Sequence, residues 1–280
     1  MGVASPYGGD LAGAYVMELN DLGLLDDGDI DLVEAGIALA RADRPEADAS
    51  RLRRLVSGWA IALQRDTPPV SGSGRARRLS NLIASEAGLT GASDDYDNPL
   101  NADLIAVVER GRGLPVALSI LYVALARRVG WRANALNLPG HVIVEIKGGV
   151  DTALIDPFDH GMGISRDRAV EIARHGGGDA ATARFEPMTN RQLLIRLITN
   201  QASRARSGGD TVRALRLYER MTAIAPRLSS LWWERARLEQ LLGHNNAARG
   251  SLTAMLETTH DTAMSRRIQA ALAALARSES

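Results

Sequence analysis

The residues best suited to chemistry are a histidine and an aspartate near the middle of the chain. His141 follows Pro139-Gly140 at the start of one apolar segment, and Asp156 precedes Pro157 at the end of the next. A histidine that takes up a proton and a carboxylate that orients it are the base and its partner in nucleophilic catalysis. The chain contains no cysteine, which excludes a thiolate nucleophile and a thiolate metal site.

These two residues are predicted on neighbouring strands that follow a buried helix. Pro115 can begin a helix because its missing N–H needs no partner there, and Gly130 ends the apolar segment. Three alternating segments then predict strands over residues 133–138, 141–147 and 153–156. The middle strand has two faces, with Val142, Val144 and Ile146 on one and His141, Ile143 and Glu145 on the other. A helix followed by an antiparallel meander predicts an α+β core.

The segments before this core are predicted to be helical. Asp31 can cap a helix that ends before Pro45, and residues 47–65 and 75–87 carry apolar side chains at helical spacing. Between the last two, Ser71-Gly72-Ser73-Gly74 predicts a turn or short linker. This part of the chain therefore contributes helices that support the core.

Beyond Phe185-Glu186-Pro187 the chain is predicted to be helical and repetitive. Small and apolar residues recur 34 residues further along the chain. The matched pairs are Ala202 with Ala236, Gly209 with Gly243, Ala214 with Ala248, Tyr218 with Leu252 and Met221 with Met255. This period is typical of tetratricopeptide repeats. Two units and a last helix over residues 263–277 are near the minimum for independent stability, so we expect the tail to lean on the first domain.

Three motifs in fixed order resemble the SirB1 family, whose front domain belongs to the transglutaminase-like superfamily and often precedes a tetratricopeptide-like tail. The motifs are Asn101…Leu104…Arg110-Gly111-Arg112-Gly113-Leu114-Pro115, Leu138-Pro139-Gly140-His141 and Ile155-Asp156-Pro157-Phe158. The resemblance covers roughly residues 30–259 and implies a papain-like core, a helical tail and a bacterial source. The domains implied are an N-terminal extension over 1–25, a transglutaminase-like domain over 26–187 and a repeat-like domain over 188–280.

Active members of that superfamily use a thiolate at the start of the buried helix, a strand histidine and an aspartate on the next strand. His141 and Asp156 match the histidine and the aspartate, whereas Pro115 occupies the nucleophile position. Ser119 is the nearest hydroxyl, and a serine inside a helix is expected to bond a backbone carbonyl one turn back. We therefore predict a vestigial dyad, no catalytic residue and a pseudoenzyme.

The dyad itself leaves three alternatives open. His141 and Asp156 can form a satisfied polar network that fixes strand register, or retain a binding or catalytic role in which His141 activates water. A metal site is the third alternative, using His141 and Asp156 with Glu145, Asp159 or His160. We predict no metal and no cofactor, because too few of these groups are placed to converge.

Four residues are candidates for binding a partner. Arg110 and Arg112 lie close in sequence to the helix start and can hold a carboxylate or phosphate through their paired N–H groups. Asn101 belongs to the same motif. In the tail, Trp232 is predicted in the core of the repeat, while Trp233 points about 100° away around the helix and can pack on the front domain or meet a partner.

Composition narrows the class of partner. The chain has 33 basic and 33 acidic residues and a formal net charge of +0, which argues against nucleic-acid or membrane binding through bulk positive charge. No signal peptide and no apolar run of membrane-spanning length is recognisable, so we expect a cytoplasmic protein. The predicted function is a non-catalytic adaptor or regulatory protein that binds a protein or peptide. The alternative is a hydrolase or amidase that uses His141 and Asp156.

Overall fold

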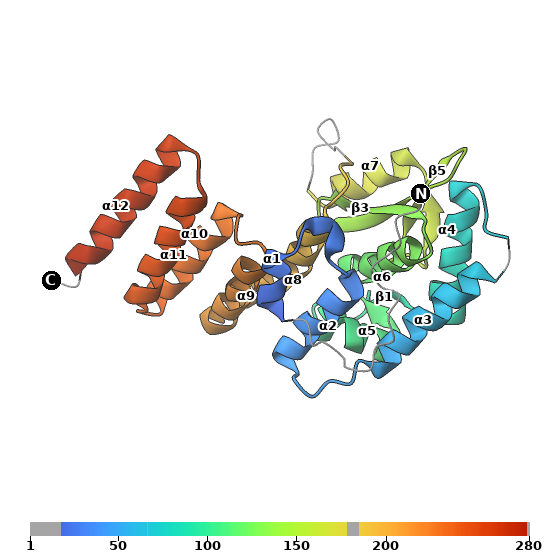
Figure 1. The fold of residues 1–280 in the computed structure, drawn as a ribbon, viewed down its shortest axis with the longest axis horizontal. Helices are drawn as coiled ribbons and strands as arrows, with labels where there is room; N and C mark the ends of the chain where they lie inside the picture. The colour runs from blue at the N-terminus through green and yellow to red at the C-terminus, as the bar shows by residue number, and fades with distance from the viewer. Residues whose placement is uncertain (1–17, 66, 178–184, 279–280) are drawn as a thin grey trace, which may run out of the picture.

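The computed structural model describes residues 18–65, 67–177 and 185–278, and it is an α+β domain followed by an all-helical tail (Figure 1). This confirms the predicted fold class. The elements that precede the central helix are α1 (Leu19–Leu24), η1 (Asp27–Asp29), α2 (Leu32–Asp43), α3 (Ser50–Gln64), α4 (Gly72–Ser80), the π-helical turn η2 (Asn81–Glu86), β1 (Thr90–Gly91), η3 (Pro99–Ala102), α5 (Leu104–Arg110) and β2 (Arg112–Gly113).

The predicted linker at residues 71–74 is wrong, because this segment is the first turn of α4. The Ser71 side chain caps the helix by accepting the Gly74 N–H at 3.0 Å. Gly72 is needed for close packing, since a Cβ there would stand 2.6 Å from the carbonyl oxygen of Ile146. The carboxylate of Asp151 accepts the N–H groups of Gly72 and Ser73. Gly72 therefore allows α4 to pack closely against the sheet and does not make the chain flexible.

The centre of the front domain is a helix packed on an antiparallel sheet. The helix is α6 (Pro115–Arg128), and the strands β3 (Arg132–Leu138), β4 (His141–Lys147), β5 (Thr152–Asp156) and β6 (Met162–Ile164) lie in the order β3-β4-β5-β6. The three predicted strands are confirmed. Strand β6 and the helix α7 (Arg166–His175) that follows it were not predicted from the sequence.

The sheet separates two apolar clusters, as the alternation in β4 predicts. Val142, Val144 and Ile146 belong to the main core, which also contains α6. Ile143 belongs to a smaller cluster on the other face, where Leu136 and Leu138 of β3 meet Ala169 and Ala173 of α7. Helices α6 and α7 therefore cover opposite faces of the sheet.

The tail consists of two helix pairs and a last helix. They are α8 (Asn190–Ser207), α9 (Thr211–Ile224), α10 (Ser229–Leu241), α11 (Asn245–Thr258) and α12 (Thr262–Ser278). Helices α8 and α9 share the main core with the front domain, whereas α11 and α12 form a second cluster with part of α10. Figure 1 shows α1 beside α8 and α9, with α10–α12 extending away from the front domain. The first pair is therefore part of the front domain's interior.

An ion pair between α2 and α9 should make part of the stability depend on pH. Arg220 Nη2 lies 2.7 Å from Asp43 Oδ1. Burial raises the pKa of Asp43, but the hydrogen bond and charge of Arg220, with the charges of Arg213 and Arg216, hold it below its ordinary value of 3.8. A carboxyl whose pKa is lower in the folded chain stabilises the fold above its unfolded pKa, and this contribution is lost as pH falls through the folded value.

The Asp43 side chain is 36% exposed, so solvent screens its charge, and we expect Asp43→Asn to lower the free energy of unfolding at pH 7 by less than about 1 kcal/mol. The difference from wild type should shrink below about pH 4, where the wild-type carboxyl also becomes neutral. Urea unfolding at several pH values measures this. A difference that stays constant down to pH 3 would mean that the charge of Asp43 does not contribute.

Candidate functional site

The antiparallel pairing of β4 and β5 brings His141 and Asp156 together. His141 is the first residue of β4 and Asp156 the last of β5, so both lie at the same end of the pair. His141 Nε2 lies 2.8 Å from Asp156 Oδ2, and the other carboxylate oxygen accepts the N–H of Phe158 at 2.9 Å. The side chain of Asp156 is 7% exposed and that of His141 15% exposed. The pair is thus an oriented imidazole that is mostly buried but not sealed from solvent.

The start of α6 holds no reactive side chain. Pro115 occupies the first position of the helix and is buried. The hydroxyl of Ser119, fully buried, donates to the carbonyl oxygen of Val142 in β4 at 3.4 Å. The expectation that it would bond a carbonyl of its own helix is wrong, because the close packing of α6 on β4 places a strand carbonyl within reach. The hydrogen bond ties the helix to the strand that carries His141.

A tight turn behind the pair was not predicted as part of the site. His160 has a φ of 52° and Gly161 a φ of 66°, so two successive residues are left-handed. Ser80 donates its hydroxyl to the carbonyl of Gly161 at 2.6 Å. The hydroxyl of Tyr122 in α6 is buried in the same place, and no partner accepts or donates to it among the described residues. These groups hold the turn that joins β5 to β6 next to Asp156.

Burial is the largest influence on the pKa of the Tyr122 hydroxyl. Burial raises the pKa of its hydroxyl, the neighbouring Ser80 hydroxyl lowers it, and the charge of Asp156 raises it further, so that the pKa lies well above its usual range. A neutral Tyr122 therefore faces the turn at every physiological pH.

Aromatic rings extend the site away from the dyad. The ring of Phe158 meets His141 edge-on with centroids 5.9 Å apart, and Tyr96 meets Phe158 in the same way at 5.9 Å. The guanidinium of Arg204 in α8 lies 5.2 Å from the centre of the Tyr96 ring. Sequence reasoning missed Tyr96, although it is the single aromatic residue in the acidic segment Asp94–Asn98. A continuous row of contacts therefore joins the front domain's dyad to the first helix of the tail.

The predicted binding residues Asn101 and Arg110 come together beside this row. Arg110 donates to the Asn101 side-chain oxygen at 2.9 Å and forms an ion pair with Asp95 at 3.2 Å. The fully buried Asn101 side chain donates to the carbonyl of Asp95. Both residues hold the loop that carries Tyr96. The side chain of Arg112 is exposed and has no hydrogen bond or ion pair to any residue that the structure describes.

The tryptophans of α10 lie in the second cluster. Trp232 donates its indole N–H to the carbonyl of Pro226 at 2.8 Å, as suits a residue inside the repeat. Trp233 packs against the same cluster, and the guanidinium of Arg267 in α12 lies 4.6 Å from its ring centre. Trp233 thus contacts the last helix of the tail and not the front domain.

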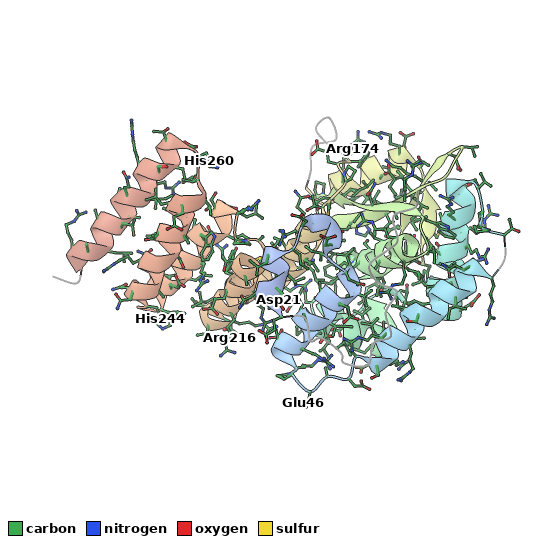
Figure 2. All side chains as sticks on the ribbon, viewed as in Figure 1. Asp21, Glu46, Arg174, Arg216, His244 and His260 are labelled. Atoms are coloured by element: carbon green, nitrogen blue, oxygen red, sulfur yellow. The ribbon has the colours of Figure 1, made fainter. Side chains whose placement is uncertain are left out.

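The other charged groups do not converge on the dyad. Among residues 18–65, 67–177 and 185–278, no three histidine, aspartate or glutamate side chains are close enough to hold a metal ion. His244 and His260 lie at turns of the tail (Figure 2). Two cavities of about 190 and 560 Å³ are lined by residues of the front helices and of α8 and α9, and neither is lined by His141 or Asp156.

A helix packed on an antiparallel sheet, a strand-borne His–Asp pair and a following helical repeat define a transglutaminase-like protein with a repeat tail. Residues 49–199 match the family model of the transglutaminase-like superfamily, and residues 202–273 match a tetratricopeptide repeat model. The chain belongs to the transglutaminase-like superfamily. The first match ends inside α8. None of the helices in the described part of the chain has the length and apolar character needed to cross a bilayer.

Relatives are found in bacteria and in animals. A UPF0162 protein of Xylella fastidiosa is 27% identical over 257 residues, which covers 88% of this chain and 92% of the relative. The F-box only protein 21 of Homo sapiens is 28% identical over 136 residues, covering 47% of this chain and 22% of that protein. Among solved structures, a crystal structure of menin aligns with 85% of this chain and 68% of menin, at 11% identity and a TM-score of 0.39.

Proposed function

We propose that this protein binds a polypeptide at the face formed by His141, Phe158 and Tyr96 and forms no covalent intermediate with it. We also propose that it belongs to the SirB1 family and works in the cytoplasm as a non-catalytic adaptor or regulatory protein. Its partner is then a protein or peptide and not a nucleic acid or a membrane.

One observation carries this proposal. The pair of His141 and Asp156 keeps a 2.8 Å contact, while the helix start that should supply a nucleophile holds Pro115. Ser119 does not replace the missing group, because its hydroxyl is fully buried and engaged with the carbonyl of Val142. A histidine without a nucleophile beside it can still donate and accept hydrogen bonds. Recognition of a peptide backbone requires such hydrogen bonds.

The position of the pair supports a binding role. His141 is partly exposed beside the rings of Phe158 and Tyr96, and aromatic rings with an adjacent hydrogen-bonding group are common at recognition surfaces. The tetratricopeptide repeat favours the same class of partner, since concave repeat surfaces commonly hold extended segments of other proteins. The exposed side chain of Arg112, which has no ion pair with another described residue, can contribute to this face.

Hydrolysis by activated water is the second candidate function. It is favoured by His141, whose side chain is 15% exposed and whose Nε2 is held by Asp156. Such a site needs no nucleophilic side chain, because the imidazole takes the proton from water as the oxygen attacks a carbonyl carbon, and the imidazolium then returns that proton to the ester oxygen or amide nitrogen as its bond to the carbon breaks.

A binding assay and a hydrolysis assay on the same variants separate the two candidates. We expect wild-type protein to show no ester or amide hydrolysis above buffer and to bind a subset of an immobilised peptide array. His141→Ala should lower the affinity for the bound peptides by about tenfold, because it removes a hydrogen-bonding group from the centre of the face.

His244→Ala is the matched control, because His244 is exposed at a turn of the tail. Thermal melting checks that both variants fold. Hydrolysis that disappears in His141→Ala and persists in His244→Ala would replace the binding proposal by the hydrolytic one. Equal peptide binding by both variants and wild type would remove the dyad from the proposed function.

A further inference from the structure

A cavity of about 190 Å³ lies where the front domain meets the first helix pair of the tail. Its walls come from α2, η3, α8 and α9. Its apolar lining includes residues that are each at most 8% exposed, namely Leu39, Ala40, Ala102, Leu197, Ile198 and Leu217. An apolar cavity of about 150 Å³ in another protein takes up benzene. The cavity between α2 and α9 therefore has room for a ligand somewhat larger than benzene.

The mouth of this cavity is polar and carries more cations than anions. The polar residues that line it are Asp43, Arg44, Asp103, Gln201, Arg213 and Arg220. Arg44 donates to the Asp103 carboxylate at 2.8 Å, and Arg220 donates to the Asp43 carboxylate at 2.7 Å. Two of the three arginines are therefore matched by carboxylates of the mouth itself.

Arg213 is the arginine that remains. Its guanidinium donates to Gln201 Oε1 at 3.0 Å, and it lies 3.8 Å from Asp43 Oδ2, which is beyond hydrogen-bond distance. The side chain of Arg213 is 38% exposed, so a ligand at the mouth can reach it. The bond to Gln201 holds the guanidinium in place without neutralising its charge. A guanidinium binds a carboxylate more strongly than a neutral acceptor, so charge complementarity favours a ligand with one carboxylate.

The two carboxylates of the mouth do not offer a site for a cationic ligand. Asp103 caps α5 by accepting the N–H of Ala106 at 2.9 Å through Oδ1, and its Oδ2 accepts from Arg44. Asp43 accepts from Arg220 through Oδ1. An ammonium group would thus meet carboxylates that arginines already neutralise, and the guanidinium of Arg213 would repel it.

We propose that this cavity binds a short aliphatic carboxylate. Its hydrocarbon part lies among Leu39, Leu197 and Leu217, and Arg213 binds its carboxylate at the mouth. The ligand is either a free carboxylic acid or the C-terminal aliphatic residue of a polypeptide, since both present an apolar chain next to a carboxylate.

The proposed site is separate from the proposed function at the dyad. Neither His141 nor Asp156 lines the cavity. Its walls belong to α2 and η3 of the front domain and to α8 and α9 of the tail, so a bound ligand contacts both parts of the chain. A ligand that binds the folded chain alone raises its stability, so occupancy should raise the melting temperature of the whole protein.

The test titrates the full-length chain with isocaproate in a ligand-observed NMR experiment. We expect a dissociation constant of about 1 mM, as is common for a ligand of this size. Isocaproamide has the same shape without the charge and should bind at least about tenfold more weakly, as should acetate, which lacks the apolar chain. Isohexylamine should bind more weakly than isocaproamide, because the mouth repels it. Arg213→Gln should lower the affinity for isocaproate by about tenfold and leave that for isocaproamide unchanged.

Arg216→Gln is the matched control. Arg216 is exposed on the same helix (Figure 2) and does not line this cavity, so the variant should keep the affinity for isocaproate within about twofold of wild type. Thermal melting checks folding, and Gln201→Leu, which releases the Arg213 guanidinium, keeps the test valid if Arg213→Gln does not fold. Equal losses in Arg213→Gln and Arg216→Gln, equal affinity for isocaproate and isocaproamide, or no binding of isocaproate at about 10 mM would overturn the proposal.

Two peptides distinguish the two sources of the carboxylate. Both consist of Gly and Ser and end in leucine, one with a free carboxylate and one with an amide. Tighter binding of the free peptide than of isocaproate, with no binding of the amide, would identify a polypeptide C-terminus as the ligand. Binding of isocaproate and of neither peptide would identify a free carboxylic acid. His141→Ala should change none of these affinities, and a loss as large as that in Arg213→Gln would show that the site is not separate from the dyad.

Discussion

Deletion of residues 190–280 is expected to leave the front domain unfolded. The deletion removes four side chains of α8 that are each at most 2% exposed in the main core, namely Leu193, Leu194, Leu197 and Ile198. Burial of one such side chain contributes about 1.5–3 kcal/mol. Four of them account for much of a typical net stability of about 5–15 kcal/mol. The front domain cannot replace this packing from its own residues.

Polar contacts at the start of α8 add to the expected loss. The Asp27 carboxylate accepts the N–H groups of Asn190 and Arg191 at 2.9 Å each. The Arg191 guanidinium donates to the carbonyl oxygens of Leu22 and Leu25, both at 2.7 Å, and to that of Ile224. Without α8, the carboxylate and the carbonyls of α1 lose these partners, and unpaired groups in a packed interface are costly.

A second truncation is the matched control. Deletion of residues 229–280 removes α10–α12, which contain most of the second cluster, and keeps α8 and α9 in place. We expect this shorter chain to fold and to lose about 2–5 kcal/mol, since Leu231 and Leu238 of α10 reach the main core. Circular dichroism and urea unfolding measure both. A cooperative transition in the protein that ends at residue 189, as strong as in the full chain, would contradict the prediction.

The strands and the dyad could be predicted because their signals are local. Alternation in β4 places His141 on one face, and the turns on either side set the antiparallel order that brings Asp156 beside it. Helix α7 lacked such a signal, since Ala169 and Ala173 are its only buried residues and alanines supply little apolar surface. Strand β6 has three residues, too few for a period to appear.

The rest of the site depends on contacts between distant segments. The rings of Tyr96 and Phe158 meet because Asn101 and Arg110 fix one loop and Asp156 fixes the other, which no spacing in the sequence reveals. Sequence reasoning identified Arg110 by its charge near the helix start, but the structure uses that charge to hold a loop.

Gly161→Ala is expected to have the largest effect of any single substitution at the site. Gly161 has a φ of 66°, and a Cβ there would stand 2.5 Å from both the Ser80 and the Tyr122 hydroxyl oxygens. A left-handed alanine costs about 1–2 kcal/mol, and overpacking adds about 1–3 kcal/mol. The turn that joins β5 to β6 must then move, and with it the neighbouring Asp156. We expect a loss of about 2–5 kcal/mol in stability and weaker peptide binding.

Two other glycines separate the causes of this loss. Gly130→Ala meets a left-handed φ of 77° with no atom within 4 Å of its Cβ, so it should cost only the strain of about 1–2 kcal/mol. Gly163→Ala, in β6, has open space and no left-handed φ and should be close to neutral. Urea unfolding of the three variants compares their stabilities directly. If Gly161→Ala destabilises the protein no more than Gly130→Ala does, the hydroxyls of Ser80 and Tyr122 move aside without cost.

A double substitution tests whether the Tyr122 hydroxyl is the obstacle. Tyr122→Phe alone should be neutral or slightly stabilising, because it removes a buried hydroxyl that has no hydrogen-bond partner among the described residues. Combined with Gly161→Ala it should recover about 1 kcal/mol or more, since one of the two crowding oxygens is gone. Strictly additive effects would assign the crowding to Ser80, whose hydroxyl donates to the Gly161 carbonyl and therefore cannot be removed without loosening the turn that supports Asp156.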